Sequence, residues 1–369
     1  MRSDSAFVVE LDLDRPLVDD PRFGHNRWHP AIAPVATIEQ DEIVRADLRD
    51  GLDCQIVRDS TLRDVNAMDM TRGHPLTGPF FVIGAAPGDL LEVEILEVAH
   101  RGFGFTCVRR GAGMLQRFEP EPFLARWLLD GVGATSPEIP GVRIPAAPFV
   151  GVVGVAPSED NLARYREREE ALRQSGGDVP LPYPKTAVPS SEPVASAGLR
   201  TIPPRENGGN LDARYLGPGA IVKIPVQVTG ALLSLGDAHY AQGHGEICSQ
   251  AIEMAASVSF TCRVRKGEEL GWRPEGPVLL ARPARPTVGQ RLVTTGLPVR
   301  SGSPQREMDL NEAAVAALLE MERYLVLERG LSRSQAHVIM SVAVDLEVLE
   351  AVNKPNVLVG ASIDTGIFD

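Results

Sequence analysis

The densest group of side chains that could do chemistry lies between residues 236 and 246. The segment reads GDAHYAQGHGE and follows an apolar run of strand-like residues. Residues two apart on a strand point to the same face, so Asp237 and His239 could share one ligand site at a strand end. The following glycines allow a sharp turn, which could bring His244 or Glu246 to the same point. A carboxylate with an imidazole is a ligand set suited to zinc or a related divalent ion.

A structural role for the same residues stays open at this stage. Asp237 could be a turn residue, and His239 could be a surface histidine or a hydrogen-bonded core histidine. The number of acid and imidazole groups set between glycines in this short segment favours the ligand interpretation.

Two further segments contain candidate polar residues. Residues 205–212 read RENGGNLD, a pattern most often found in turns. Asp212 is the best ligand or hydrogen-bond acceptor in it, and Asn210 could orient a substrate carbonyl. In the N-terminal third, His74 stands between a glycine and a proline, whereas His25 lies in a polar and aromatic segment with a structural role as its simpler interpretation.

The sequence contains no pattern for a covalent nucleophile. It has no G-x-S-x-G motif, and its Ser-Ser stretches lie in polar loops without a suitably spaced lysine. Glycine-rich dinucleotide and P-loop motifs are also missing. Water activated by a metal ion is therefore the better-supported nucleophile.

Composition excludes several classes of protein. With 37 basic and 49 acidic residues, the net charge is 37 − 49 = −12, which argues against a general nucleic-acid binder. Hydrophobic residues make up 43% and charged residues 23%, as in a folded globular protein. The sequence shows neither an apolar run of membrane-spanning length nor a signal-peptide core, so we expect a cytoplasmic protein that does not associate with membranes.

The hydrophobic pattern predicts a mainly β fold. Period-two alternation or continuous apolar runs predict strands, and helical spacing with capping residues predicts a few helices near the C-terminus. The predicted strands are 91–95, 221–226, 258–264 and 342–348. The predicted helices are 309–328, 332–340 and a polar one within 158–174.

We expect a β-sandwich-like N-terminal part and a second β-rich or α+β part with the C-terminal helices. The predicted boundaries are 1–157 for the first, 158–209 for a polar helix and a Pro/Gly/Ser-rich insert, and 210–369 for the second. Segments rich in proline, glycine and serine, like this insert, are usually irregular surface segments or linkers.

Several blocks of the sequence, in the same order and spacing, resemble the acetamidase/formamidase family. They are residues 76–79, 84–89, 151–158, 201–212, 224–226, 230–239, 242–246, 251–254, 324–326 and 330–332. The resemblance implies a mainly β, oligomeric enzyme that hydrolyses short aliphatic amides such as formamide or acetamide. The polar insert, 159–200, resembles the formamidase branch. One residue departs from the family pattern, because His244 stands where an aspartate is expected.

Combining the residues with this resemblance gives a mechanistic hypothesis. A divalent ion, with zinc as the first expectation, activates water and polarises the amide carbonyl. Glu246 is expected to act as general base and then as general acid, Asn210 to hold the amide, and Asp237 to be essential. The predicted metal ligands are His74, Asp212, Asp237 and His239.

Two alternatives remain. The chain could hydrolyse a larger or functionalised amide, or it could be a non-catalytic binding protein on the same scaffold. In the main hypothesis the partners are a small amide substrate and further copies of this chain in a homo-oligomer.

Overall fold

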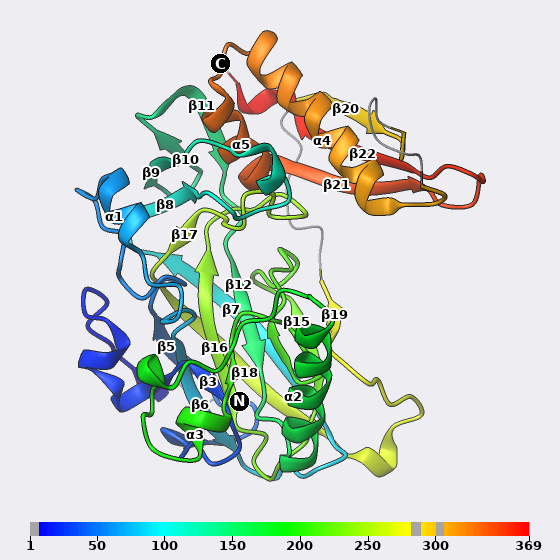
Figure 1. Ribbon diagram of the computed structural model, residues 1–369. Helices are drawn as coiled ribbons and strands as arrows, with labels where there is room; N and C mark the ends of the chain where they lie inside the picture. Colours follow the sequence, from blue (N-terminus) through cyan, green and yellow to red (C-terminus); the bar gives the residue numbers. More distant parts are fainter. Residues whose placement is uncertain (1–6, 282–288, 300–305, 369) are drawn as a thin grey trace.

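The computed structural model describes residues 7–281, 289–299 and 306–368, and most of its regular structure is β-strand (Figure 1). The mainly β prediction is therefore confirmed. A six-stranded sheet has the strand order β1-β5-β18-β7-β15-β19. Its strands are β1 (Phe7–Val9), β5 (Val44–Leu48), β7 (Leu90–His100), β15 (Ile221–Pro225), β18 (Ala256–Arg265) and β19 (Val278–Leu280).

A second sheet of eleven strands contains the segments predicted to do chemistry. Its main path is β11-β10-β9-β8-β17-β16-β12-β14, and β6, with β2 and β4 beside it, also pairs with β16. The strands are β2 (Gly24–His25), β4 (Ala36–Ile38), β6 (Leu76–Val82), β8 (Phe103–Val108), β9 (Phe123–Leu129), β10 (Gly133–Ser136), β11 (Ile139–Pro145), β12 (Phe149–Gly154), β14 (Gly208–Asn210), β16 (Leu233–His239) and β17 (Glu253–Met254).

Side chains from both sheets meet in one hydrophobic core. Phe80 on β6 and Phe260 on β18 are fully buried, and their rings meet edge to face with centroids 5.6 Å apart. All seven residues of β16 are buried, because this strand lies inside its sheet with neighbours on both sides. Burial of β16 on both faces explains why its sequence is a nearly continuous apolar run until Asp237.

The C-terminal part is a three-stranded sheet packed against two helices. The strand order is β20 (Arg291–Gly296), β22 (Leu358–Asp364), β21 (Val344–Glu350), and the helices are α4 (Leu310–Leu327) and α5 (Arg333–Ala343). Asp309 caps α4 and Ser332 caps α5, as the sequence pattern predicts. The strand predicted from residue 342 begins two residues later, because α5 continues to Ala343.

The remaining elements are short, apart from one surface helix. α2 (Glu159–Gln174) is mostly polar, but it packs Leu162 and Tyr165 against Trp28 in a small separate core. The other helices and strands are α1 (Leu62–Ala67), α3 (Val194–Ala197), β3 (Arg27–Trp28) and β13 (Leu199–Arg200). Single turns of 3-10 helix cover Leu17–Asp19, Pro21–Phe23, Gln116–Phe118, Pro184–Thr186, Gly267–Glu269 and Thr365–Ile367.

Strands from both ends of the chain mix in both large sheets. β7 lies between β18 and β15, and β12 lies between β16 and β14. The division at residues 157 and 209 stays a prediction. The insert is not only a surface segment, since Thr201 and Asn207 in it are buried.

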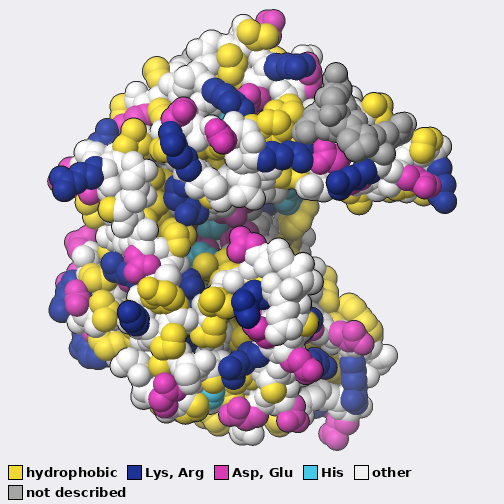
Figure 2. All heavy atoms as spheres, in the orientation of Figure 1, with side chains coloured by type: hydrophobic (Ala, Val, Ile, Leu, Met, Phe, Trp, Pro, Cys, Tyr) yellow, Lys and Arg dark blue, Asp and Glu magenta, His cyan; other side chains and the backbone are white. Residues whose placement is uncertain are grey.

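The molecule is hollowed on one face. Figure 2 shows this hollow between the part that carries α4 and β20–β22 and the part that carries α2, with histidine and acidic side chains visible inside it. None of the helices in the described part of the chain combines the length and apolar character that a membrane span needs.

Candidate active site

Asp237 and His239 lie at the end of β16, where the sequence places them. Both are buried, with 2% and 1% of their surface exposed. The Nε2 atom of His239 is 3.4 Å from Oδ1 of Asp237. The His239 ring also packs edge-on against Phe149 on the neighbouring strand β12, with centroids 5.0 Å apart. The strand end thus holds a carboxylate and an imidazole together inside the protein.

Glu253 joins this pair from β17. In the β16–β17 register it lies directly opposite His239, and its Oε2 atom is 3.3 Å from Nε2 of His239. Its other oxygen, Oε1, accepts a hydrogen bond from the backbone nitrogen of Ala251 (3.1 Å). The predicted ligand set did not contain Glu253. Only the pairing of two strands separated by a long loop shows its position, and the sequence does not reveal that pairing.

His74 reaches the same carboxylate from the loop before β6. Its Nε2 atom is 4.0 Å from Oδ2 of Asp237. Its backbone nitrogen donates to Oγ1 of Thr201 (2.6 Å), and that hydroxyl donates to the carbonyl oxygen of His74 (3.1 Å). The insert therefore helps to position a predicted ligand.

Asp212 lies on the other side of His239. Its Oδ1 atom is 4.0 Å from Nδ1 of His239, and one ligand atom each from Asp212, Asp237 and His239 lie within 4.8 Å of one another. The backbone nitrogen of Asp212 donates to the carbonyl oxygen of Gly151 on β12 (3.2 Å). The structure thus brings all four predicted ligands together around Asp237 and His239.

Gln242 orients the His239 ring and accepts a hydrogen bond from its Nδ1 atom. Its Nε2 atom donates to the carbonyl oxygen of Asp212 (2.7 Å), so its Oε1 atom is left to accept from Nδ1 of His239 (3.0 Å). With Nδ1 as the donor to Gln242, the Nε2 atom faces Asp237 and Glu253. An outer hydrogen bond of this kind is how proteins orient a metal-binding histidine.

Glu246 and Asn210 also lie at this site, but His244 does not. Glu246 is half-buried, and one of its oxygens lies within 4.8 Å of ligand atoms of His239 and Glu253. Asn210 has a buried Oδ1 atom without a hydrogen-bond partner. The ring of His244 instead packs against Tyr215, with centroids 5.1 Å apart. The turn after β16 therefore places Glu246 at the site and His244 outside it.

The backbone of three acidic residues here is in an unusual conformation. Asp212, Asp237 and Glu246 have φ angles of 42°, 57° and 44°, in the left-handed region. Residues other than glycine seldom adopt this region, and such conformations cluster at functional sites.

The acids of the site are buried so close together that they disfavour one another's ionisation. Burial and the nearby Asp237 raise the pKa of Asp212 to about 8, and burial together with Asp212 raises the pKa of Glu246 well above its usual range. Burial lowers the pKa of His239, but Glu253 and Asp237 outweigh it and raise that pKa overall. Among the described residues, no lysine or arginine forms an ion pair with these carboxylates. The arrangement therefore favours the binding of a cation.

The atoms at the centre fit a divalent cation. Two buried atoms that face each other, Asp237 Oδ1 and His239 Nε2, have no hydrogen-bond partner. Zinc binds nitrogen and oxygen ligands at about 2.0–2.1 Å in a tetrahedron, which places ligand atoms roughly 3.3 Å apart. The distances from His239 Nε2 to Asp237 and Glu253, 3.4 and 3.3 Å, match this spacing.

Two glycines give the Asp237 carboxylate its space. A Cβ atom at Gly51 would lie 2.0 Å from Oδ1 of Asp237, and one at Gly151 would lie 3.0 Å from Oδ2. Both positions therefore require glycine if the carboxylate is to keep its place. No local sequence pattern indicates either requirement, because the two glycines come from distant segments.

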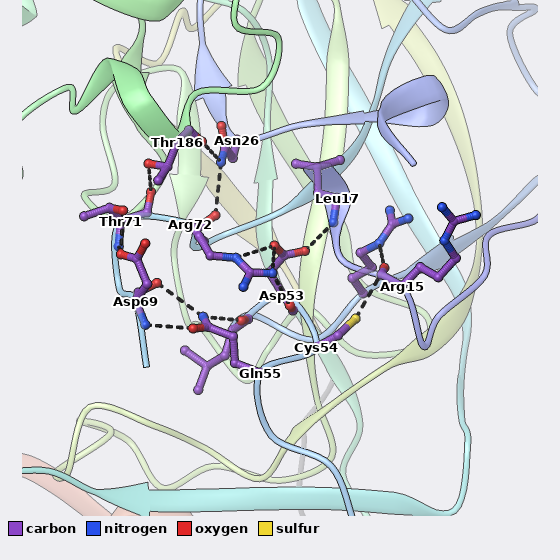
Figure 3. A network of polar contacts seen from close by, with 12 residues as sticks. Arg15, Leu17, Asn26, Asp53, Cys54, Gln55, Asp69, Thr71, Arg72 and Thr186 are labelled. Atoms are coloured by element: carbon purple, nitrogen blue, oxygen red, sulfur yellow. Dashed lines mark hydrogen bonds and ion pairs between the residues drawn. The ribbon is translucent and has the colours of Figure 1, made fainter. Parts of the chain in front are cut away.

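A network of polar contacts holds the loops that carry Gly51 and His74 (Figure 3). Arg72 donates to Oδ2 of Asp53 from Nε (3.0 Å) and Nη2 (2.7 Å). Gln55 accepts from the backbone nitrogen of Asp69 (2.7 Å). These contacts tie residues 50–55 to residues 69–74, and thus fix the segment beside the Asp237 carboxylate.

The fold is mainly β, and buried carboxylates and histidines converge at the end of one of its strands. No nucleophilic serine or cysteine lies among these residues. Such a site is typical of an enzyme. The chain belongs to the acetamidase/formamidase family, whose model matches residues 10–369. The resemblance drawn from the sequence blocks is thereby confirmed.

Individual relatives match over nearly the whole chain. A formamidase of Methylophilus methylotrophus is 33% identical to this chain, and the alignment covers 98% of this chain and 93% of the formamidase. An acetamidase of Mycolicibacterium smegmatis is also 33% identical, covering 91% and 89%. A solved structure of a gamma lactamase from Delftia acidovorans is 32% identical and has a TM-score of 0.93, covering 99% of this chain and 94% of its own.

Proposed function

We propose that this amide hydrolase cleaves short aliphatic amides, such as formamide and acetamide, to ammonia and the carboxylate with the help of a divalent cation. Family membership supports the reaction. The observation that carries the role of the cation is the convergence of Asp237, His239 and Glu253, with unpartnered buried atoms between them.

The cation would be held by His239, Asp237 and Glu253. Two further predicted ligands, His74 and Asp212, lie next to these residues. A zinc ion bound in such a site lowers the pKa of water towards 7 and polarises a carbonyl group. Gln242 keeps the His239 ring in the orientation that this role requires. We therefore add Glu253 to the metal ligands predicted from the sequence.

Glu246 and Asn210 would act on the substrate. An amide nitrogen leaves poorly unless it is protonated, so the reaction needs a group that moves a proton to it. Glu246 lies beside the cluster, and burial with the nearby Asp212 raises its pKa, which makes its carboxylate a stronger base. We assign it to take a proton from water and deliver it to the leaving nitrogen. Asn210, with its unpartnered Oδ1, would hold the amide NH₂ group.

A cyclic amide is the second candidate substrate. This chain superimposes over 99% of its length on a gamma lactamase, with a TM-score of 0.93. Relative kcat/KM values on formamide, acetamide, a longer linear amide and a five-membered lactam separate the two candidates. Higher values for the small linear amides support the main proposal, and a higher value for the lactam supports the second.

Asp237→Asn tests the site directly. We expect ammonia release and bound metal both to be lost, while circular dichroism shows an intact fold, because the neutral amide removes the central ligand. Asp160→Asn on the exposed face of α2 is the matched control and should retain both. Retention of activity and metal in Asp237→Asn would show that the site lies elsewhere.

Location and assembly are part of the same proposal. We expect a cytoplasmic enzyme, and we expect a homo-oligomer from the family resemblance. Light scattering coupled to gel filtration gives the mass of the particle, and a monomer would contradict this expectation.

A further inference from the structure

We propose that the site holds two divalent cations, with the Asp237 carboxylate bridging them. This inference rests on the proposed metal-dependent function and deepens it. It follows from the different neighbours of the two Asp237 oxygens, one set for each cation.

The first cation position lies at Oδ1 of Asp237. His239 Nε2 is 3.4 Å from this oxygen, and Glu253 Oε2 is 3.3 Å from the same nitrogen. The space beside Gly51 is bounded by the same oxygens, since a Cβ there would lie 2.0 Å from Asp237 Oδ1 and 3.1 Å from Glu253 Oε2. One imidazole and two carboxylates thus surround this position.

The second cation position lies at Oδ2 of Asp237. His74 Nε2 is 4.0 Å from this oxygen. A Cβ at Gly151 would lie 2.7 Å from Asp212 Oδ1 and 3.0 Å from Asp237 Oδ2, so these oxygens border the same space. The buried Oδ1 atom of Asp212 has no hydrogen-bond partner. The His74 imidazole, the Asp212 carboxylate and the second oxygen of Asp237 therefore border this position.

The acids of the site give each cation position a carboxylate of its own. Glu253 borders the first position and Asp212 borders the second, while Asp237 borders both. Within the described residues these three acids form ion pairs with histidines only. Carboxylate oxygens and imidazole nitrogens are ligands that zinc takes in proteins, so the site offers separate ligands for two cations.

Metal counting tests this inference without relying on activity. The full-length protein is stripped with a chelator, reloaded with zinc and desalted, and zinc per chain is measured by mass spectrometry. We expect two zinc ions in the wild type, one in Glu253→Gln, one in Asp212→Asn and none in Asp237→Asn. Asp160→Asn is the control and should keep two. Circular dichroism of every variant checks the fold.

The outcomes separate this inference from the proposed function. One zinc ion in the wild type overturns the second cation and leaves the proposed function standing, whereas no zinc overturns both. Two ions in the wild type and in both Glu253→Gln and Asp212→Asn would place the second cation elsewhere and overturn the assignment. If a variant fails to fold, Glu253→Asp and Asp212→Glu replace it, and each should weaken binding of one ion by at least tenfold.

Discussion

At the scale of single residues, the Asp237 carboxylate depends on the absence of a side chain at Gly51. We predict that Gly51→Ala lowers kcat/KM at least about 100-fold, because its Cβ would lie 2.0 Å from Oδ1 and displace the carboxylate. Gly131→Ala is the matched control, since a Cβ there meets nothing within 4 Å. Steady-state kinetics on formamide compares the two. Equal activity of both variants would show that the carboxylate does not need its present position.

His25 gives a prediction for stability against pH. Its Nδ1 and Nε2 atoms lie 2.7 Å from the carbonyl oxygen of Arg27 and from Oγ of Ser234, and burial lowers its pKa to about 4. The unfolded chain, with a pKa near 6.5, therefore binds more protons between pH 6.5 and 4, and stability falls as the pH falls through this range. The loss amounts to about 3 kcal/mol.

Urea unfolding at several pH values checks this prediction. His25→Gln keeps a hydrogen-bonding side chain but does not titrate, so its free energy of unfolding should fall less than that of the wild type between pH 6.5 and 4. Parallel curves for the two proteins would refute the role of His25.

The types of the ligand residues could be predicted, but not their full set. Asp237 and His239 are two apart on one strand, so local spacing is enough to join them. Glu253 and Gly51 reach the same point only through strand pairing and loop packing between distant segments. No local pattern encodes such contacts, which explains why the sequence analysis assigned neither residue to the site.

At the scale of elements, the start of β21 positions two loops of the site. Asp345 is 4% exposed and accepts hydrogen bonds from Arg214, from Arg291 (2.8 Å) and from the backbone nitrogen of His244 (3.1 Å). Arg214 lies two residues after Asp212, and His244 lies two before Glu246. Asp345 therefore links both loops to the C-terminal sheet.

We predict that Asp345→Asn lowers kcat about tenfold or more and destabilises the protein by about 3 kcal/mol, because it leaves the largely buried guanidinium group of Arg214 without a full counter-charge. Glu347→Gln, an exposed neighbour on the same strand that also pairs with Arg291 (3.2 Å), should change neither greatly. Kinetics together with zinc affinity measures the effect. A variant with lower stability but unchanged kcat and zinc affinity would show that Asp345 does not position the site.

The helices were easier to predict than the sheets. Caps and helical spacing are local, so α4 and α5 were predicted almost to their ends. Strands were also found, but their order was not, because partners such as β7 and β18 are separated by more than 150 residues. The start of β21 was set too early because alternating apolar residues also fit the buried end of α5.

At the scale of the whole molecule, cation removal should lower thermal stability. A cation that binds only the folded state stabilises it by about 2.7 kcal/mol when its free concentration is 100 times Kd. For a chain of 369 residues this corresponds to a fall in Tm of roughly 3–4 °C per cation after chelation. Scanning calorimetry before and after chelation, with zinc added back, measures the shift. An unchanged Tm would mean that the site does not bind a cation tightly.

The groups that meet around Asp237 are spread from Gly51 to Glu253, and the loop that carries Glu246 is fastened to Asp345. During synthesis on a ribosome, the early segments leave the exit tunnel long before their partners exist. The site therefore cannot assemble until the strand that carries Glu253 and the start of β21 have left the ribosome, so the chain gains activity only late in its synthesis.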